Sequence, residues 1–251
     1  MFQKMHTIYI GYDPKQHVYV DMLKKSIELN TKEKYNIVPL VQSELRRSGL
    51  YRRGTDVVDG IEIDQFDRRP FSTEFSFTRF LVPFLNQRSG LALFMDADMF
   101  VRADISQIFN LYGRDTSKAI HCVKHDYWPE VDLKMDGKVQ TVYFRKNWSS
   151  FVLWNCDHPA HDDLSVCDVN SRSGSWLHSF QWLETDVIGA LPSKWNWLDS
   201  HDDPTIGASN VHFTTGGPLY SGWTGPREID NKYANEWRDF AKKHSVEKPY
   251  Y

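Results

Sequence analysis

The amino-acid sequence predicts an α/β protein in which a mixed, mostly parallel central sheet is flanked by helices. Two observations support this fold class. Short apolar runs of strand length alternate with segments of helical periodicity, and several runs end directly in turn-forming or acidic residues. No repeat, low-complexity tract or linker divides the chain, so we expect residues 1–251 to form one domain. With 41% hydrophobic and 25% charged residues, the chain can bury a sizeable core.

The first half of the chain opens with alternating strand and helix patterns. In order, we expect a strand at 6–10, a helix at 16–29, a strand at 37–40 and a helix at 73–85. The first helix is supported by Val20, Leu23 and Ile27, which share one face. Residues 43–72 are polar, rich in Arg and broken by Gly and Pro, which predicts a loop-rich insertion. Pro83 is expected to kink or end the last of these helices.

The second half predicts further strands and helices around one less regular region. In order, we expect a strand at 91–95, a helix at 105–111, strands at 119–124 and 151–154, and helices at 162–170, 176–183 and 228–243. Residues 126–147 follow neither period and contain a Met-Asp-Gly turn. They would suit a hairpin or a lid over a site.

The charge and cysteine content argue against several classes of partner and site. A formal charge of −3 gives no overall field that would attract nucleic acid or an anionic membrane. No apolar stretch approaches the length of a membrane span, and the first residues lack a signal-peptide layout. We therefore expect a cytoplasmic protein whose contact with any membrane is peripheral. Cys122, Cys156 and Cys167 form no CxxC pair, so free or buried thiols are expected rather than a zinc site.

Two aspartates follow the strand predicted at 91–95. Asp96 and Asp98 flank Ala97, and the chain then returns at once to apolar residues. Carboxylates this close repel each other unless a cation lies between them, which points to a divalent metal site. The alternative is a strand-end turn in which one Asp caps the helix that starts near Ile105.

A second polar pair, Tyr12 and Asp13, follows the first predicted strand. Open α/β sheets bind ligands beyond the carboxyl ends of their strands. We therefore expect this pair and residues 96–98 to share one crevice. The 9 Trp and 12 Tyr residues lean towards a carbohydrate or nucleotide ligand, because such rings stack on sugars and bases, although core packing accounts for most of them.

Five sequence blocks occur in the order IYIGYD, FSFTRFLVP, LALFMDADMFVRADI, LPSKWNWLD and VHFTTGGP. In this order they resemble the glycosyltransferases of family 8, which have the GT-A fold, a Rossmann-like nucleotide-sugar-binding domain. The resemblance is strongest around the Asp pair and weakest in residues 43–72 and 125–175. It implies a metal-dependent enzyme that moves a hexose from a UDP-sugar to an acceptor hydroxyl, on a carbohydrate or another molecule, with retention of anomeric configuration.

The resemblance also implies a metal site made by Asp96, Asp98 and His212. A carboxylate pair offers the hard oxygen ligands that Mn²⁺ or Mg²⁺ prefers, and the mixed Asp, Asp, His set suits Mn²⁺ better than Ca²⁺. A single His is usually structural. Its position in the HFTTGGP block, downstream of the Asp pair, favours a metal ligand instead.

Further positions are implied to bind the donor. They are Tyr12, Asp13, Arg79, Asp96, Ala97, Asp98, Ser149, Ser150, Thr214, Gly216 and Gly217. Tyr12 and Asp13 would meet the uracil, although a plain strand-end turn at Asp13-Pro14 is equally compatible. An Arg in the middle of an apolar helix is costly to bury unpaired. Arg79 is therefore expected to have a carboxylate or phosphate partner near the Asp pair.

The donor site departs from the family pattern in two places. The Lys that usually follows the HF motif is absent, because residues 216–218 read Gly-Gly-Pro. The phosphate charge is then left to the metal, to Arg79 or to another basic residue, with backbone N–H groups of the glycine loop close by. Ser149 and Ser150 stand where the family usually has Asn-x-Gly, and their hydroxyls are expected to contact the sugar.

The catalytic positions implied by the resemblance are Glu184, Thr185 and Asp186, which match a DQD motif. Thr185 replaces the Gln, so the role of that Gln does not carry over. The two acidic side chains could orient sugar hydroxyls or stabilise positive charge at the anomeric carbon. The alternative is a helix N-terminal acidic pair that favours the helix dipole.

Two other functions stay open from the sequence. A non-catalytic nucleotide-sugar-binding module would explain the Thr185 substitution, but it does not require an intact set of metal ligands. A sugar-phosphate nucleotidyltransferase usually has a Gly-rich, basic loop after its first strand. Here that loop reads GYDPKQH, with one Gly and one Lys, which makes this class the weaker alternative.

Overall fold

The computed structural model describes residues 5–70, 73–126, 145, 147–220 and 223–244. Its centre is a six-stranded sheet in the order β2-β1-β5-β8-β7-β9. The strands are β1 (Thr7–Gly11), β2 (Asn36–Leu40), β5 (Leu91–Met95), β7 (Ile120–Cys122), β8 (Phe151–Asn155) and β9 (Ile188–Ala190). Within this sheet only β8 runs antiparallel to its neighbours. The predicted mixed, mostly parallel sheet is therefore confirmed.

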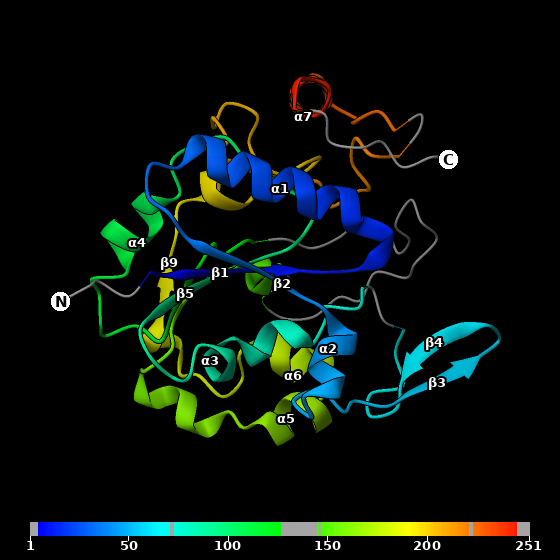
Figure 1. The fold of residues 1–251 in the computed structure, drawn as a ribbon, viewed down its shortest axis with the longest axis vertical. Helices are drawn as coiled ribbons and strands as arrows, with labels where there is room; N and C mark the ends of the chain where they lie inside the picture. Colours follow the sequence, from blue (N-terminus) through cyan, green and yellow to red (C-terminus); the bar gives the residue numbers. More distant parts are fainter. Residues whose placement is uncertain (1–4, 71–72, 127–144, 146, 221–222, 245–251) are drawn as a thin grey trace.

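Helices cover both faces of this sheet (Figure 1). On one side lies α1 (His17–Asn30), with α7 (Glu228–Lys243) outside it. On the other side lie α2 (Gln42–Arg47), α3 (Val82–Leu85), α5 (Val166–Ser171) and α6 (Gly174–His178). The helix α4 (Ser106–Tyr112) lies near the amino-terminal end of β5. Short 3-10 helices lie at Pro14–Gln16, Thr78–Leu81, Trp148–Ser150, Pro159–Asp163, Thr185–Val187 and Ser193–Asn196. Among the described residues, none of the helices combines the length and the apolar composition that a membrane span requires.

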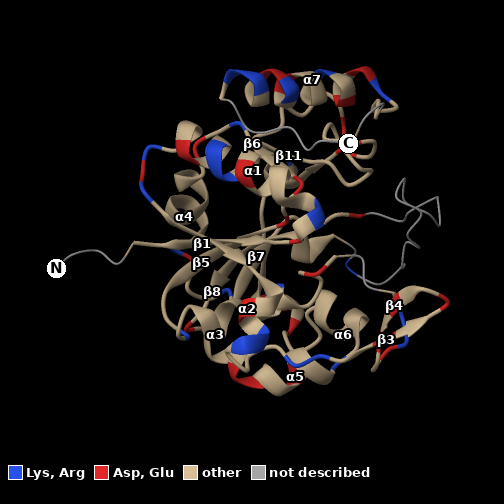
Figure 2. Ribbon diagram, turned by 45° about the vertical axis from the view of Figure 1, so that its right-hand side comes forward, with Lys and Arg blue, Asp and Glu red and all other residues tan. Residues whose placement is uncertain are grey.

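The two long helices are amphipathic. Val20, Leu23 and Ile27 of α1 are buried, as their shared face predicts. On α7, Tyr233 and Trp237 are buried, whereas its outer face carries alternating acidic and basic residues (Figure 2). The helices α1 and α7 are therefore held to the body by apolar stripes, and an ion pair between Glu236 of α7 and Arg102, at 2.8 Å, adds to the contact of α7.

A second, three-stranded sheet has the order β10-β11-β6. Its strands are β6 (Met99–Val101), β10 (Trp197–Leu198) and β11 (Asn210–His212). Since β11 runs antiparallel to β6, His212 is paired with Met99, and the Phe213 N–H donates to the Asp98 carbonyl at 2.9 Å. This register carries the carboxyl end of β11 to the turn that follows β5.

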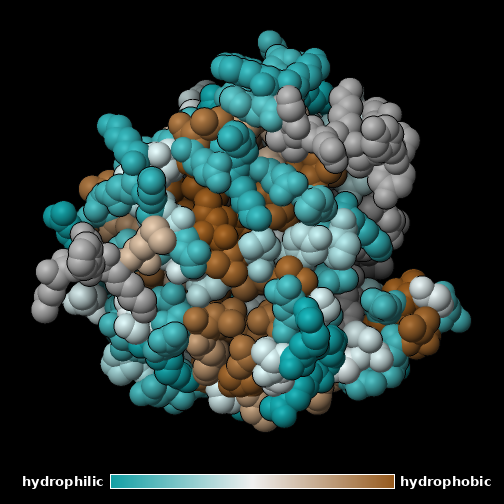
Figure 3. Space-filling view, viewed as in Figure 1, coloured by the Kyte–Doolittle hydropathy of each residue, from teal (hydrophilic) through white to brown (hydrophobic). Residues whose placement is uncertain are grey.

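The prediction that residues 43–72 are a loop-rich insertion is wrong in part. The segment contains α2 and a hairpin of β3 (Thr55–Val58) and β4 (Ile61–Asp64). The two residues between these strands, Asp59 and Gly60, both have positive φ, as a tight type I′ hairpin turn requires. The Asp-Gly pair is the sequence signal that would have predicted this hairpin. The hairpin projects from the body, and its tip shows apolar side chains to solvent (Figure 3); they are Val57, Val58 and Ile61.

A buried ion pair anchors this hairpin. The Arg53 side chain donates to both carboxylate oxygens of Asp64, one of them at 2.9 Å, and to the Val169 carbonyl at 3.1 Å. Its guanidinium also stacks on the ring of Phe77, 3.8 Å from the centroid. Both charges are buried, so each depends on the other for compensation.

Other element predictions need smaller corrections. The helix predicted at 73–85 is a 3-10 helix at Thr78–Leu81 followed by the short α3, and Pro83 lies in the first turn of α3. Proline is accepted there because first-turn N–H groups have no helical partner. In place of the helices predicted at 162–170 and 176–183, the shorter α5 and α6 begin and end at other residues. Residues 127–144 and 146 of the predicted hairpin or lid lie outside the described residues. The three cysteines are free, as expected.

One buried histidine gives stability a pH dependence. His161 is fully buried, its Nε2 lies 3.1 Å from the Ala119 carbonyl, and its ring packs on Trp154. Burial lowers the pKa of His161 to about 4, whereas an unfolded His titrates near 6.5. Between these values the unfolded chain binds more protons. Stability is therefore fully present above about pH 6.5 and falls as the pH drops towards 4.

We expect His161→Phe to flatten this loss. The variant cannot take up the proton, so the free energy of unfolding should fall less steeply between pH 6.5 and 4, by up to about 1.4 kcal/mol per pH unit. Urea unfolding at several pH values measures the slope, with the exposed His17→Gln as control. An unchanged slope in His161→Phe would contradict the assignment.

Candidate functional site

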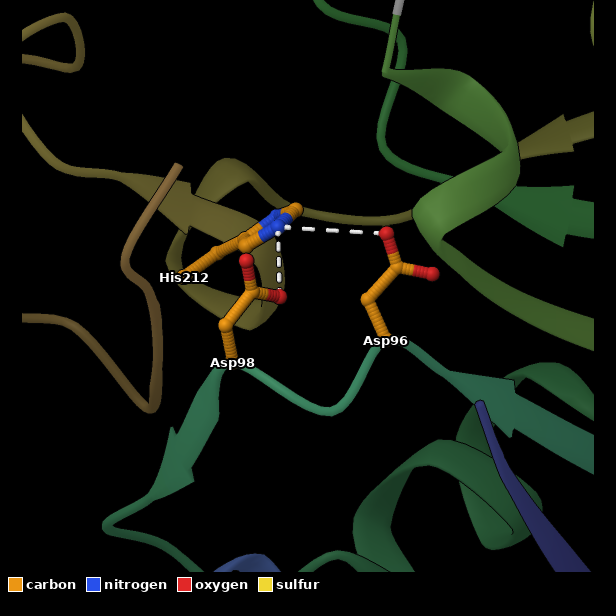
Figure 4. A group of neighbouring side chains, drawn as sticks. All are labelled: Asp96, Asp98 and His212. Carbon is orange, nitrogen blue, oxygen red and sulfur yellow. Dashed lines mark ion pairs between the residues drawn. The ribbon is translucent and has the colours of Figure 1, made fainter. Parts of the chain in front are cut away.

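The predicted metal ligands come together at the carboxyl end of β5. Asp96, Ala97 and Asp98 form the turn between β5 and β6, and the buried Ala97 leaves the two carboxylates pointing to the same side as His212 (Figure 4). One ligand atom from each of Asp96, Asp98 and His212 lies within 4.8 Å of the others. The pairing of β6 with β11 brings His212, the last residue of β11, next to this turn.

The distances within this cluster are short. His212 Nε2 lies 3.2 Å from Asp98 Oδ1 and 4.0 Å from Asp96 Oδ2. Burial alone would lower the pKa of His212, but the negative charges of Asp98 and Asp96 outweigh burial and raise it. The negative charges of Asp96 and Asp98 therefore make this site favourable for a positive charge.

Arg79 confirms the expectation of a carboxylate partner near the Asp pair. Its Nη1 lies 2.8 Å from Asp96 Oδ1, and its side chain also donates to the carbonyls of Ser149 and Phe75 at 3.0 and 3.3 Å. The guanidinium lies over the ring of Phe94. Asp96 thus meets Arg79 with one oxygen and turns the other towards His212.

The far side of His212 is held by a residue that sequence reasoning did not single out. Asn196 is fully buried, and its Oδ1 lies 2.9 Å from His212 Nδ1. The residue lies in the LPSKWNWLD block, but nothing in the pattern of that block shows which of its side chains reaches His212. The contact exists because β10, which follows Asn196, runs parallel to β11.

The glycine loop after His212 is held from two sides. On one side the buried Asp199 carboxylate accepts the Thr214 N–H at 2.7 Å and the hydroxyls of Thr214 and Thr215 at 2.8 and 2.5 Å. Burial raises the pKa of Asp199 to about 6 in spite of these hydrogen bonds. The Thr214 N–H, which was predicted to lie near the phosphates, is therefore already donated within the protein.

On the other side the loop is held by Tyr19 of α1. The Tyr19 hydroxyl donates to the Gly216 carbonyl at 2.7 Å and accepts the Leu219 N–H at 3.1 Å. Gly217 has a φ of +78°, and a Cβ there would lie 2.5 Å from the Tyr19 hydroxyl and 2.7 Å from Phe213 Cβ. Only glycine can adopt this positive φ and also leave the space next to Tyr19 and Phe213 free, without a shift of those neighbours.

Tyr12 and Asp13 lie at the same edge of the sheet as the Asp pair, because Ile10 of β1 is paired with Met95 of β5. Asp13 accepts the N–H groups of Lys15 and Glu74 at 2.9 and 3.2 Å. The interpretation of Asp13 as a turn residue therefore holds. A contact with uracil stays a prediction.

Ser149 and Ser150 are both buried beside the cluster. The Ser149 hydroxyl lies 2.7 Å from His178 Nδ1, and the Ser150 hydroxyl donates to the Asn147 carbonyl at 2.7 Å. Both hydroxyls therefore already have hydrogen-bond partners within the protein. A contact of either hydroxyl with the sugar stays a prediction.

The structure does not bring Glu184, Thr185 and Asp186 to the cluster. They precede β9, whose first residue Ile188 is paired with Ile120, level with the amino-terminal end of β5. All three strands run in the same direction. The triplet therefore lies at the amino-terminal edge, across the sheet from Asp96, and this placement corrects the expectation that it flanks the reacting centre.

Comparisons with known proteins agree with this architecture. No model of a protein family matches the sequence. Protein CDI from Arabidopsis thaliana is 42% identical over 250 residues, which cover 98% of this chain and 91% of that protein. The solved structure of galactosyltransferase LgtC in complex with donor and acceptor sugar analogues superposes with a TM-score of 0.55 at 13% identity, covering 94% of this chain and 95% of that chain.

A further structural match is the apo form of the bifunctional glycosyltransferase WbbM. It superposes with a TM-score of 0.54 at 13% identity and covers 97% of this chain. This chain spans about half of WbbM, 52% of its length. At such identities the structural matches establish the fold, which is the GT-A fold of glycosyltransferases.

We expect Gly217→Ala to destabilise the protein by about 2–4 kcal/mol. A positive φ costs a non-glycine residue about 1 kcal/mol, and the contacts with Tyr19 and Phe213 add overpacking. Gly90→Ala is the matched control, because Gly90 also has positive φ but nothing within 4 Å of its Cβ position. Equal losses in urea unfolding would show that the loop is not held as described.

Proposed function

This chain belongs to the same protein family as Protein CDI of Arabidopsis thaliana, and we propose that it is a metal-dependent glycosyltransferase. It moves a hexose from a UDP-sugar to an acceptor hydroxyl, with retention of configuration at the anomeric carbon. LgtC, which shares the fold, has been solved with donor and acceptor sugar analogues, and the proposal extends such a pair of ligands to this chain.

The observation that carries this proposal is the cluster of Asp96, Asp98 and His212 at the ligand-binding edge of a GT-A sheet. Two carboxylates and one imidazole are a donor set that fits Mn²⁺, with Mg²⁺ as the second choice. The fit is supported by Asn196, which bonds to His212 Nδ1 and leaves Nε2 facing the carboxylates. When bound, the metal would act as a Lewis acid on the leaving diphosphate.

The other side chains of the site have roles in binding and positioning. Arg79 fixes one oxygen of Asp96 and adds a buried positive charge beside the acidic turn. Tyr12 and Asp13, at the same edge, are proposed to meet the uracil. The loop at 216–217, held by Tyr19, is proposed to lie against the diphosphate, where the absence of side chains allows close approach.

The proposal assigns no side chain of residues 184–186 to the anomeric carbon, because they lie at the opposite edge of the sheet. A retaining transfer in which the acceptor attacks from the face of the leaving group places little demand on a protein nucleophile. In this account the chain contributes by orienting donor and acceptor and by stabilising the departing negative charge.

We expect Asp98→Asn and His212→Ala each to weaken Mn²⁺-dependent UDP binding at least tenfold. Each removes one ligand of the cluster, whereas the backbone bonds of β6 and β11 remain. Isothermal titration of UDP with Mn²⁺ and with chelator gives the affinities, and Asp203→Asn, an exposed loop carboxylate, is the control. Unchanged affinity in both ligand variants would remove the metal assignment.

The activity itself is tested by UDP release from a panel of UDP-sugars, with Mn²⁺ and with chelator, first without acceptor and then with simple sugar acceptors. We expect Mn²⁺-dependent release from one donor, which would also identify the sugar. If UDP binds but no donor turns over with any acceptor, the protein is a binding module. If UDP does not bind in the presence of metal, the proposed function fails at its centre.

A further inference from the structure

A chain of buried hydrogen bonds runs away from the metal cluster into the protein. His212 Nδ1 lies 2.9 Å from Asn196 Oδ1, Asn196 Nδ2 lies 2.9 Å from Ser150 Oγ, and the Ser150 hydroxyl lies 2.7 Å from the Asn147 carbonyl. Asn196, Ser150 and His212 are all buried. Water therefore has little access to the bonds between these three side chains, and the directions of the bonds are set by the groups themselves.

The direction of each bond follows from the last acceptor. The Asn147 carbonyl can only accept, so the Ser150 hydroxyl gives its hydrogen to it and accepts from the Asn196 amide. Asn196 Nδ2 also lies 3.5 Å from the Asn147 carbonyl oxygen, which its second amide hydrogen can reach. A flipped amide would place two oxygens against each other there, which fixes Asn196 with its oxygen towards His212.

Since the Asn196 oxygen is an acceptor, Nδ1 of His212 must carry a hydrogen. We propose that Ser150 and Asn196 act as positioning residues that keep a hydrogen on Nδ1 of His212, so that Nε2, which faces Asp96 and Asp98, is the ring nitrogen available to the metal. This inference rests on the proposed function for the identity of the metal, but the protonation of Nδ1 follows from the metal-free geometry alone.

Ser150 links both halves of the cluster. Its side chain supports His212 through Asn196, and its carbonyl accepts the Asp96 N–H at 2.9 Å. Ser149 provides a matched comparison. It is equally buried and next in sequence, but its hydroxyl bonds to His178, which lies outside this chain of bonds. Removal of either hydroxyl deletes one buried hydrogen-bonding group, but only Ser150→Ala breaks the chain of bonds that leads to His212.

The first readout is the location of the hydrogen on the imidazole. In metal-free protein labelled with ¹⁵N-histidine, long-range ¹H–¹⁵N correlation spectra identify which ring nitrogen is protonated, and His212→Gln assigns the signals. We expect a hydrogen-bonded Nδ1–H at His212 in the wild type and in Ser149→Ala. In Asn196→Leu, which has no acceptor, this signal should exchange with solvent or disappear, and Asn196→Asp, which keeps an acceptor, should restore it.

The second readout is Mn²⁺ affinity, measured by the loss of the free Mn²⁺ signal in electron paramagnetic resonance. Loss of a hydrogen-bond partner behind a metal-bound His typically costs about 10- to 100-fold in affinity. We expect a loss of that order in Asn196→Leu, a smaller but clear loss in Ser150→Ala, and wild-type affinity in Ser149→Ala. Ser150→Ala keeps the test decisive if Asn196→Leu does not fold.

Three results would overturn the inference. They are an Nε2–H form without hydrogen at Nδ1 in the wild type, equal losses of Mn²⁺ affinity in Ser149→Ala and Ser150→Ala, and wild-type affinity in Asn196→Leu. A wild type that binds no Mn²⁺ would instead overturn the proposed function. The ring-nitrogen measurement, which is made without metal, would still decide whether Asn196 holds His212.

Discussion

The repulsion between two carboxylates is the constraint on which the rest of the site depends. Asp96 and Asp98 extend to the same side from one short turn, partly shielded from water, and each negative charge raises the cost of the other. The structure offsets this cost from opposite sides, with buried Arg79 on Asp96 and His212 closest to Asp98. The segment Thr78–Leu81, which carries Arg79, and β11, which carries His212, must therefore both lie next to this turn to offset its negative charge.

One short segment supports both the cluster and the glycine loop. Asn196 holds the ring of His212. Three residues after Asn196, Asp199 holds Thr214 and Thr215, which follow His212 in the chain. The intervening strand β10 pairs with β11, so both contacts share one rigid piece of backbone. A ligand that contacts both the cluster and the loop would therefore meet two surfaces whose relative position is already fixed before binding.

The sequence predicts the elements whose signals are local. The strand before Asp96, the buried stripe of α1 and the α7 helix follow from periodicity, and the partner of Arg79 follows from the cost of burying a lone charge. Asn196 and Tyr19 could not be predicted, because their contacts join segments far apart in the sequence. The position of residues 184–186 could not be predicted from their match to a DQD motif for the same reason. The register of β9 against β7 determines at which edge of the sheet these residues lie.

The central claim is that Asp96, Asp98 and His212 hold a divalent cation that bridges to a nucleotide diphosphate. The most direct measurement is diffraction from crystals grown with Mn²⁺ and UDP, in which anomalous scattering locates the metal. The account predicts one strong Mn²⁺ peak in contact with all three side chains and with the diphosphate. UDP bound at this edge without Mn²⁺, or Mn²⁺ bound away from these three residues, would contradict it.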